Sequence, residues 1–245
     1  MTPTPAHRSI PGAMSELRTV ARADSAVGEV ALRRRGEVLE LVVDGVFAMD
    51  TVDVSTETDL AALSLARHRR PLRVLVGGLG LGFTTATVLA DERVEHVVTA
   101  EIAGPLIDWA RAGLLPVSGL DDPRLTLRNV DVAELLRDPS PAWDLVLLDV
   151  DNGPDFLVRP ENAELYAGAG LRAAVATLRP GGILAIWSSH RAPALHRALH
   201  ALGEGTVAAV VREVHRDGRE LHYVIYLVTR AGADRTDLSA PHTRE

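Results

Sequence analysis

The sequence predicts an α/β fold in which a doubly wound parallel sheet carries helices on both faces. Strand and helix patterns alternate through the middle of the chain, and strands joined by crossovers of helix length have to run parallel. The runs VLV, LVLLDV and ILAIW are almost continuously apolar, as is typical of strands that are covered on both faces. We expect strands near residues 72–77, 94–101, 124–129, 143–149 and 182–188, and helices near 82–91, 104–113, 131–138, 161–178 and 191–202.

A small β meander is expected before this sheet. From about Val27 to Val54 the chain consists of short alternating runs, which Gly36 and the Asp44-Gly45 turn signal divide. We assign residues 18–54 to this meander.

The end of the chain departs from the alternation of strands and helices. Two strand-like runs, 206–215 and 221–229, flank an Asp-Gly turn signal and predict an antiparallel hairpin that closes the sheet. The main domain then covers residues 55–231, and the aperiodic polar segments 1–17 and 232–245 are expected to be tails.

The composition bounds the function. The 245 residues are 47% hydrophobic and 24% charged, which suits a globular protein with a full core. The net charge of -7 lacks the basic footprint of a protein that binds nucleic acid or anionic lipid, so we expect neither partner. The chain contains no cysteine and no lysine, which excludes thiolate nucleophiles and Schiff-base chemistry. The N-terminus lacks a signal-peptide core and no long apolar run occurs, so a cytoplasmic protein is expected.

A glycine-rich loop, Gly77-Gly78-Leu79-Gly80-Leu81-Gly82, follows the first strand of the parallel sheet and opens a helix. Glycines let the backbone approach a ligand closely, and free N–H groups at a helix start attract anions. The dinucleotide pattern G-x-G-x-x-G fails because Phe83 occupies its last position, which disfavours nicotinamide binding. The alternative is a tight turn without a ligand.

Acidic residues stand at the next two strand ends. Glu101 ends the second parallel strand, where a carboxylate typically accepts hydrogen bonds from ribose hydroxyls. Asp131 begins the helix after the third strand and is either an ordinary N-cap or a partner for an adenine amino group. Because such strand ends face one crevice, we predict nucleoside binding there. The expected cofactor-binding residues are Gly77, Gly78, Gly80, Gly82, Glu101, Ile102, Asp131 and Val132.

The fourth and fifth strands end in groups that suit catalysis and acceptor binding. Asp149 and Asp151 are candidates for holding or deprotonating an amine, although Asp151 also fits a simple turn cap. We expect Asn152, Tyr166, Trp187 and His190 to line a substrate pocket, with a surface histidine as the alternative for His190. The calcium-loop pattern fails and no G-x-S-x-G elbow occurs, so neither a metal nor a serine hydrolase is expected.

In order and spacing these motifs resemble the spermidine synthase family, a branch of the fold that transfers groups from S-adenosylmethionine (SAM). The resemblance runs from near residue 27 to residue 229 through VLVGGLGLG, VVTAEI, NVDVAELL and WDLVLLDVDNGP. The run LLDVDNGP followed by N-x-x-LY looks like a bacterial subgroup whose aminopropyltransferase motif is degenerate. The resemblance implies a Rossmann-like SAM-transferase sheet, a small-molecule acceptor and a possible homodimer.

Departures from the family pattern leave the reaction open. Gly80 stands where the family has an Asp that holds the donor amine, and the segment from Ser55 to Asp59 lacks the family's acceptor-binding Tyr. Asp149 matches the first catalytic Asp of the family, whereas the segment that follows is shortened and leaves two alternatives for Asp151, the second catalytic Asp or a turn residue. We expect methyl transfer from intact SAM, whose carboxylate a neutral Gly80 tolerates. The alternatives are aminopropyl transfer from decarboxylated SAM, aminocarboxypropyl transfer, and a nucleoside-binding module without turnover.

Overall fold

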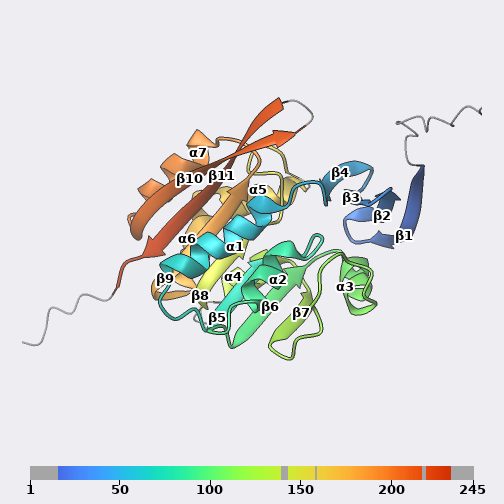
Figure 1. Cartoon of the computed structure of the whole chain (residues 1–245). Helices are drawn as coiled ribbons and strands as arrows, with labels where there is room; N and C mark the ends of the chain where they lie inside the picture. The colour runs from blue at the N-terminus through green and yellow to red at the C-terminus, as the bar shows by residue number, and fades with distance from the viewer. Residues whose placement is uncertain (1–15, 139–142, 158, 217–218, 233–245) are drawn as a thin grey trace, which may run out of the picture.

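The computed structural model describes residues 16–138, 143–157, 159–216 and 219–232 (Figure 1). Most of both expected tails and the Asp217-Gly218 turn lie outside the described residues.

The centre of the molecule is a seven-stranded sheet with the order β10-β11-β9-β8-β5-β6-β7 (Figure 1). The five strands from β9 to β7 pair in parallel, while β11 and β10 are antiparallel additions at one edge. The predicted fold class, a doubly wound sheet closed by a hairpin, is confirmed. The strands are β5 (Arg73–Gly77), β6 (His96–Glu101), β7 (Leu125–Asn129), β8 (Trp143–Leu148), β9 (Leu178–Ser188), β10 (Gly205–Arg216) and β11 (Arg219–Arg230).

Alternate side chains of the central strands enter two separate cores, because successive residues of a strand point to opposite faces. On β8, Leu145 and Leu147 pack on one face, whereas Val146 and Leu148 pack on the other. All four are at most 1% exposed, which explains why this strand reads as one apolar run. The first face is covered by α1 (Ser55–Arg67) and α2 (Phe83–Leu89); the second by α4 (Val132–Arg137), α5 (Ala163–Tyr166), α6 (Gly168–Ala176) and α7 (Pro193–Ala201).

The single helix predicted over 161–178 is interrupted. A short 3-10 turn, Pro160–Asn162, leads into α5, and Ala167 is extended before α6 begins. A Cβ atom on Gly170 would lie 2.0 Å from the carbonyl oxygen of Glu164, so only glycine allows this close packing of α6 against the end of α5. The strand expected over 182–188 starts earlier, at Leu178.

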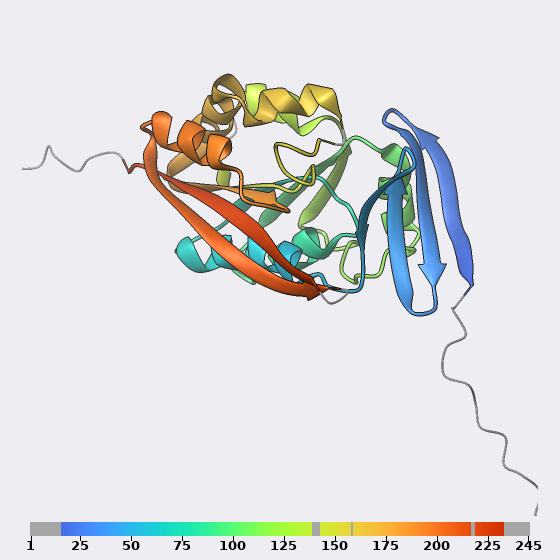
Figure 2. The same cartoon turned by 90° about the horizontal axis from the view of Figure 1, so that it is seen from above.

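A separate four-stranded antiparallel sheet forms the N-terminal layer beside the main body (Figure 2). Its first strand precedes the alternating apolar runs that begin near Val27. This strand lies at the edge of the sheet and is largely exposed, so its residues do not show the apolar alternation of a half-buried strand. The sheet packs on α3 (Gly104–Arg111) and on Leu79 and Leu81 of the glycine loop. Its strands are β1 (Leu17–Ser25), β2 (Gly28–Arg35), β3 (Val38–Val43) and β4 (Val46–Asp50).

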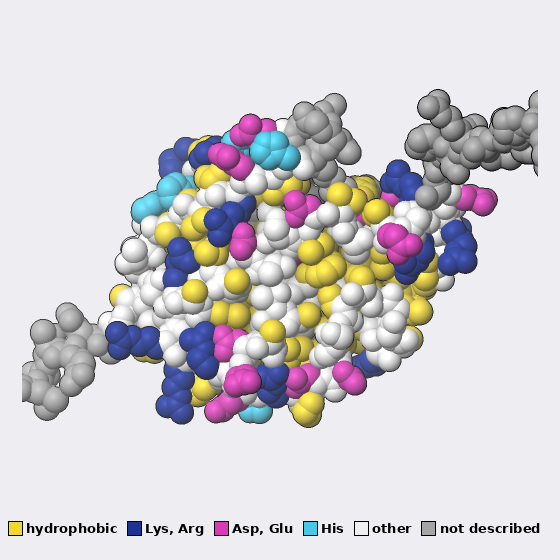
Figure 3. Space-filling model, in the orientation of Figure 1, with side chains coloured by type: hydrophobic (Ala, Val, Ile, Leu, Met, Phe, Trp, Pro, Cys, Tyr) yellow, Lys and Arg dark blue, Asp and Glu magenta, His cyan; other side chains and the backbone are white. Residues whose placement is uncertain are grey.

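The visible surface in Figure 3 mixes basic and acidic side chains rather than separating them by sign. Within the described part of the chain, no helix has both the length and the apolar character needed to cross a membrane. The cytoplasmic location expected from the sequence stays a prediction.

Candidate active site

A cavity lies where the carboxyl ends of the parallel strands meet the N-terminal sheet. The glycine loop, the ends of β6 and β8, and the start of α4 form one side, as expected for a doubly wound sheet. The N-terminal sheet forms the other side. Ten of the fourteen residues that the sequence singled out line this cavity: Gly78, Gly80, Glu101, Ile102, Asp131, Val132, Asp149, Asp151, Asn152 and Trp187.

The glycine loop runs against the backbone that follows β8. Gly78 has a φ of +89°, and a Cβ atom at this position would lie 2.1 Å from the carbonyl oxygen of Asp149. Gly77 is not a lining residue; a Cβ atom there would instead press on Val132 and Leu148, at 3.0 and 3.1 Å. The loop therefore needs glycine both for its turn and for contact with the neighbouring strand ends.

Glu101 is buried and is held by backbone groups. Its Oε2 accepts from the N–H of Leu79 at 2.9 Å, and its Oε1 accepts from the N–H of Ala103 at 2.7 Å. Burial raises the pKa of this carboxyl, and the backbone N–H groups around it oppose the rise. Glu101 thus couples the glycine loop to the end of β6 at the cavity wall.

Asp131 fulfils the capping role that the sequence offered as one alternative. Its Oδ1 accepts from the N–H of Ala133 at 2.9 Å at the start of α4. Its Oδ2 lies 3.3 Å from Nη1 of Arg159, a cavity residue that the sequence did not single out. Arg159 follows no motif, so only the folded chain places it here.

Asp149 directly follows β8 and accepts a hydrogen bond from Oγ1 of Thr84 at 2.7 Å. Burial raises the pKa of Asp149 to about 6. Glu57, in the first turn of α1, lines the same cavity. Burial and the charge of Asp149 raise the pKa of Glu57 to about 7. Glu57 and Asp149, two carboxyl groups from distant parts of the sequence, thus lie near each other in the wall of this cavity.

A second, smaller cavity adjoins the first and shares residues with it. Trp187 lines both cavities, stacks at a tilt on Tyr223 with ring centroids 5.5 Å apart, and has an indole nitrogen with no hydrogen-bond partner among the described residues. The shared residues are Ala48, Met49, Glu57, Asn152 and Trp187, and the second cavity adds acidic and aromatic groups, among them Phe47, Asp50, Asp53 and Tyr223.

The remaining candidates for catalysis and substrate binding have protein partners. Asp151 accepts hydrogen bonds from Nδ2 of Asn162 at 3.0 Å and from the hydroxyl of Tyr166 at 3.0 Å. Tyr166 is buried against Asp151 and is not a lining residue of either cavity. His190 also lies outside both linings, and its Nε2 is 2.9 Å from Oδ2 of Asp155. Tyr166 and His190 therefore do not line the pocket in which we expected them.

Two N–H groups of the glycine loop are already engaged within the chain. The N–H of Leu81 points to Sδ of Met49 at 3.3 Å, and the N–H of Gly82 donates to the carbonyl oxygen of Leu79 at 2.8 Å. A Cβ atom on Gly80 would lie 2.8 Å from the same sulfur atom. Met49 of β4 and the turn itself therefore engage the N–H groups of Leu81 and Gly82 in this structure.

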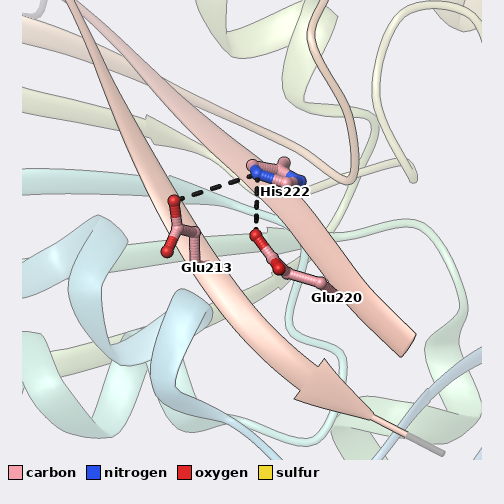
Figure 4. Close-up of side chains that lie close together, drawn as sticks. All are labelled: Glu213, Glu220 and His222. Atoms are coloured by element: carbon pink, nitrogen blue, oxygen red, sulfur yellow. Dashed lines mark ion pairs between the residues drawn. The ribbon is translucent and has the colours of Figure 1, made fainter. Parts of the chain in front are cut away.

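Three side chains of metal-ligating type meet on the β10–β11 hairpin (Figure 4), and none of them lines either cavity. Nε2 of His222 lies 3.3 Å from Glu220 and 3.9 Å from Glu213, and all three residues are exposed. Ion pairing across the β10–β11 hairpin accounts for this cluster. The prediction that the chain uses no metal stays a prediction.

The seven-stranded sheet, its closing hairpin and the cavity at the strand ends define a Rossmann-like fold of the SAM-transferase kind. The chain superposes on the crystal structure of spermidine synthase from Thermotoga maritima with a TM-score of 0.71 and 19% identity, covering 86% of this chain and 72% of the other. A spermidine synthase in complex with the transition-state analogue AdoDATO gives a TM-score of 0.74 at 19% identity, covering 91% and 77%. These likenesses establish the fold.

The sequence itself matches curated polyamine aminopropyltransferases. The protein from Thermotoga maritima is 34% identical over 112 residues, which are 42% of this chain and 38% of the relative. Those from Mycobacterium tuberculosis (strain H37Rv) and Nitrosomonas europaea are 30% identical over 68% and 69% of this chain, but the matches span only 32% and 52% of the relatives. No family model matches the chain. The fold and these relatives place the chain in the spermidine synthase-like family.

Proposed function

We propose that this chain transfers an aminopropyl group from decarboxylated SAM to a small amine acceptor. The observation that carries the proposal is the pair of carboxyl groups, Glu57 and Asp149, at the end of the cavity where the two cavities meet. Negative groups there favour a donor whose tail ends in an ammonium, and they disfavour the additional carboxylate of intact SAM. The resemblance to polyamine aminopropyltransferases supports the same choice.

The donor half of the cavity fits a nucleoside. The glycine loop allows close approach of the backbone, and Glu101 and Asp131 stand at consecutive strand ends beside it. Met49 lies against Gly80, where the resemblance places the family's amine-binding Asp. In this chain we assign the counter-charge for the donor amine to the cavity carboxylates instead of the loop.

The reaction needs little covalent help from the protein. The acceptor nitrogen forms a bond to the propyl carbon, the carbon–sulfur bond breaks with its electron pair going to sulfur, and the nitrogen loses a proton. A sulfonium is already an activated leaving group, so alignment of nitrogen, carbon and sulfur supplies most of the acceleration. Asp149, whose carboxylate is held by Thr84, orients the acceptor amine through its charge.

The direct test is an assay for methylthioadenosine and the elongated amine. The purified chain is incubated with decarboxylated SAM and a panel of diamines and triamines, with intact SAM in parallel. We expect amine-dependent methylthioadenosine from the decarboxylated donor only. Methylated product from intact SAM would overturn the proposal, and donor binding without any product would favour the non-catalytic nucleoside-binding module.

The comparisons do not support methyl transfer, our first expectation from the sequence. In addition, two N–H groups beside Gly80, those of Leu81 and Gly82, are engaged within the chain. The small-molecule amine acceptor agrees with the relatives, whereas the expected homodimer and the absence of nucleic-acid and membrane partners stay predictions.

A further inference from the structure

The junction between the two cavities carries one titratable side chain. Five of the described residues line both cavities, and of these only Glu57 can take up or release a proton. It belongs to the segment from Ser55 to Asp59, in which this chain lacks the family's acceptor-binding Tyr. If the donor occupies the first cavity, an acceptor that enters through the second has to pass Glu57.

We propose that Glu57 accepts the proton that the acceptor amine loses during transfer, while Asp149 orients that amine. This inference rests on the proposed function and adds a named proton acceptor to it. The nitrogen–hydrogen bond breaks as the nitrogen–carbon bond forms, the proton moves to the carboxylate of Glu57, and it leaves later to solvent through the second cavity.

The position of Glu57 suits a proton acceptor better than that of Asp149, because Glu57 lines both cavities and Asp149 lines only the first. Oγ1 of Thr56 donates to Oε2 of Glu57 at 2.8 Å and fixes the carboxyl group. Asp149 is held in a similar way, since its Oδ2 accepts from Oγ1 of Thr84 at 2.7 Å.

The charges around Glu57 set its proton affinity. Asp149, at the end of β8, and Asp53, just before α1, both face it, while Asp59 of α1 is paired with Arg212 of β10 at 2.6 Å. Burial and the two neighbouring carboxylates raise the pKa of Glu57 to about 7. A base works best when its pKa lies near the working pH, because it is then both deprotonated and basic enough.

A free amine side chain has a pKa of about 10.4, so the acceptor arrives as an ammonium ion near neutral pH. The cavity carboxylates attract this cation, and its transfer-competent form arises only after deprotonation. With a pKa of about 7, Glu57 is about half deprotonated at pH 7, and its ionised form can both attract the cation and take its proton.

The test compares pH–rate profiles of the wild type, Glu57→Gln and Asp53→Asn with decarboxylated SAM and the best amine. For the wild type we expect kcat to rise with pH along an acidic limb with a midpoint near 7. Glu57→Gln lowers kcat by about 10²–10³-fold and abolishes the limb. Asp53→Asn is the matched control, because it also removes one carboxylate from the wall of the second cavity. This variant should retain the acidic limb. The midpoint of the limb should shift to lower pH, because the charge of Asp53 raises the pKa of Glu57.

Each outcome decides a different question. A Glu57→Gln enzyme that keeps the acidic limb, or loses less than about threefold in kcat, overturns the role of Glu57 and leaves the proposed function standing. A wild type that forms no product with any amine overturns the proposed function and this inference together. Glu57→Asp should restore the limb at reduced rate, which separates loss of the carboxyl group from loss of folding.

Discussion

The two halves of the cavity are built in different ways. The donor half comes from consecutive strand ends, and its backbone and Glu101 hold each other through hydrogen bonds of 2.7 and 2.9 Å. The reacting half combines β4, α1, β8 and β9, with Met49, Glu57, Asp149 and Trp187 drawn from positions far apart in the chain. The donor half is thus fixed by local motifs, whereas the reacting half exists only once the N-terminal sheet and α1 pack on the main body.

This difference assigns separate roles to the two halves. The donor half offers backbone and one buried carboxylate, which suits recognition of a nucleoside. The reacting half offers two carboxyl groups with raised pKa values, which suits attraction and deprotonation of an amine. Substitutions in the first half should change affinity for the nucleoside, and those in the second should change the rate and the recognition of the donor tail.

The largest effect is expected from Asp149→Asn. The variant retains the shape of the side chain but loses the charge that orients the amine, so kcat should fall by about 10²–10⁴-fold. Affinity for methylthioadenosine, which lacks the aminopropyl tail, should stay within a few-fold of wild type because the donor half is untouched. Steady-state kinetics measures kcat, and calorimetric titration with methylthioadenosine measures the affinity of the donor half. An unchanged kcat would show that Asp149 has only a structural role and that the two halves do not differ in function.

Glu101→Gln should produce the opposite pattern. The amide cannot accept from Leu79 and Ala103 with both of its polar atoms, so the loop loses a charged hydrogen bond and the ribose loses a charged acceptor. Donor binding should weaken by about 1.5–3 kcal/mol, or roughly ten- to a hundredfold. Calorimetric titration with methylthioadenosine tests this, and an affinity equal to wild type would remove Glu101 from the donor site.

How far the sequence predicts this site follows from the same contrast. Gly78, Glu101 and Asp131 line the cavity, and each belongs to a local motif at a strand end that the sequence alone reveals. Met49, Glu57 and Arg159 also line it, but their positions depend on packing between elements that no local spacing encodes. Tyr166 and His190 were assigned by their place after a strand or on the preceding helix, but their side chains turn to Asp151 and Asp155.

The close approach that joins the halves can be broken at Gly78. Gly78→Ala forces a Cβ atom to 2.1 Å from the Asp149 carbonyl oxygen at a φ of +89°, and should lower the free energy of unfolding by about 2–3 kcal/mol. Gly45→Ala is the matched control, since its φ is +76° but nothing lies within 4 Å of the added atom. Its loss should be about 1 kcal/mol. Equal losses in urea titrations would mean that the contact with Asp149 is unimportant.

The raised pKa of Asp149 predicts a pH dependence of stability. The folded carboxyl titrates at about 6 instead of 3.8, so between these values the folded chain binds more protons than the unfolded chain. Its contribution therefore makes the free energy of unfolding fall as pH rises from about 4 to 6. Asp149→Asn should remove this contribution and make the protein more stable at pH 8 by about 1–2 kcal/mol. If Asp149→Asn were less stable than the wild type at pH 8, the buried charge of Asp149 would not destabilise the folded protein, which would contradict this prediction.

The central claim is that the reacting half selects a cationic donor tail. Side-by-side calorimetric titration of the wild type with decarboxylated and intact SAM at pH 7.5 tests it most directly, because the two donors differ by one carboxylate. With Glu57 and Asp149 at that end of the cavity and the N–H groups of the glycine loop engaged, decarboxylated SAM should bind at least about tenfold more tightly, a difference of about 1.4 kcal/mol. Equal affinities, or tighter binding of intact SAM, would contradict the account.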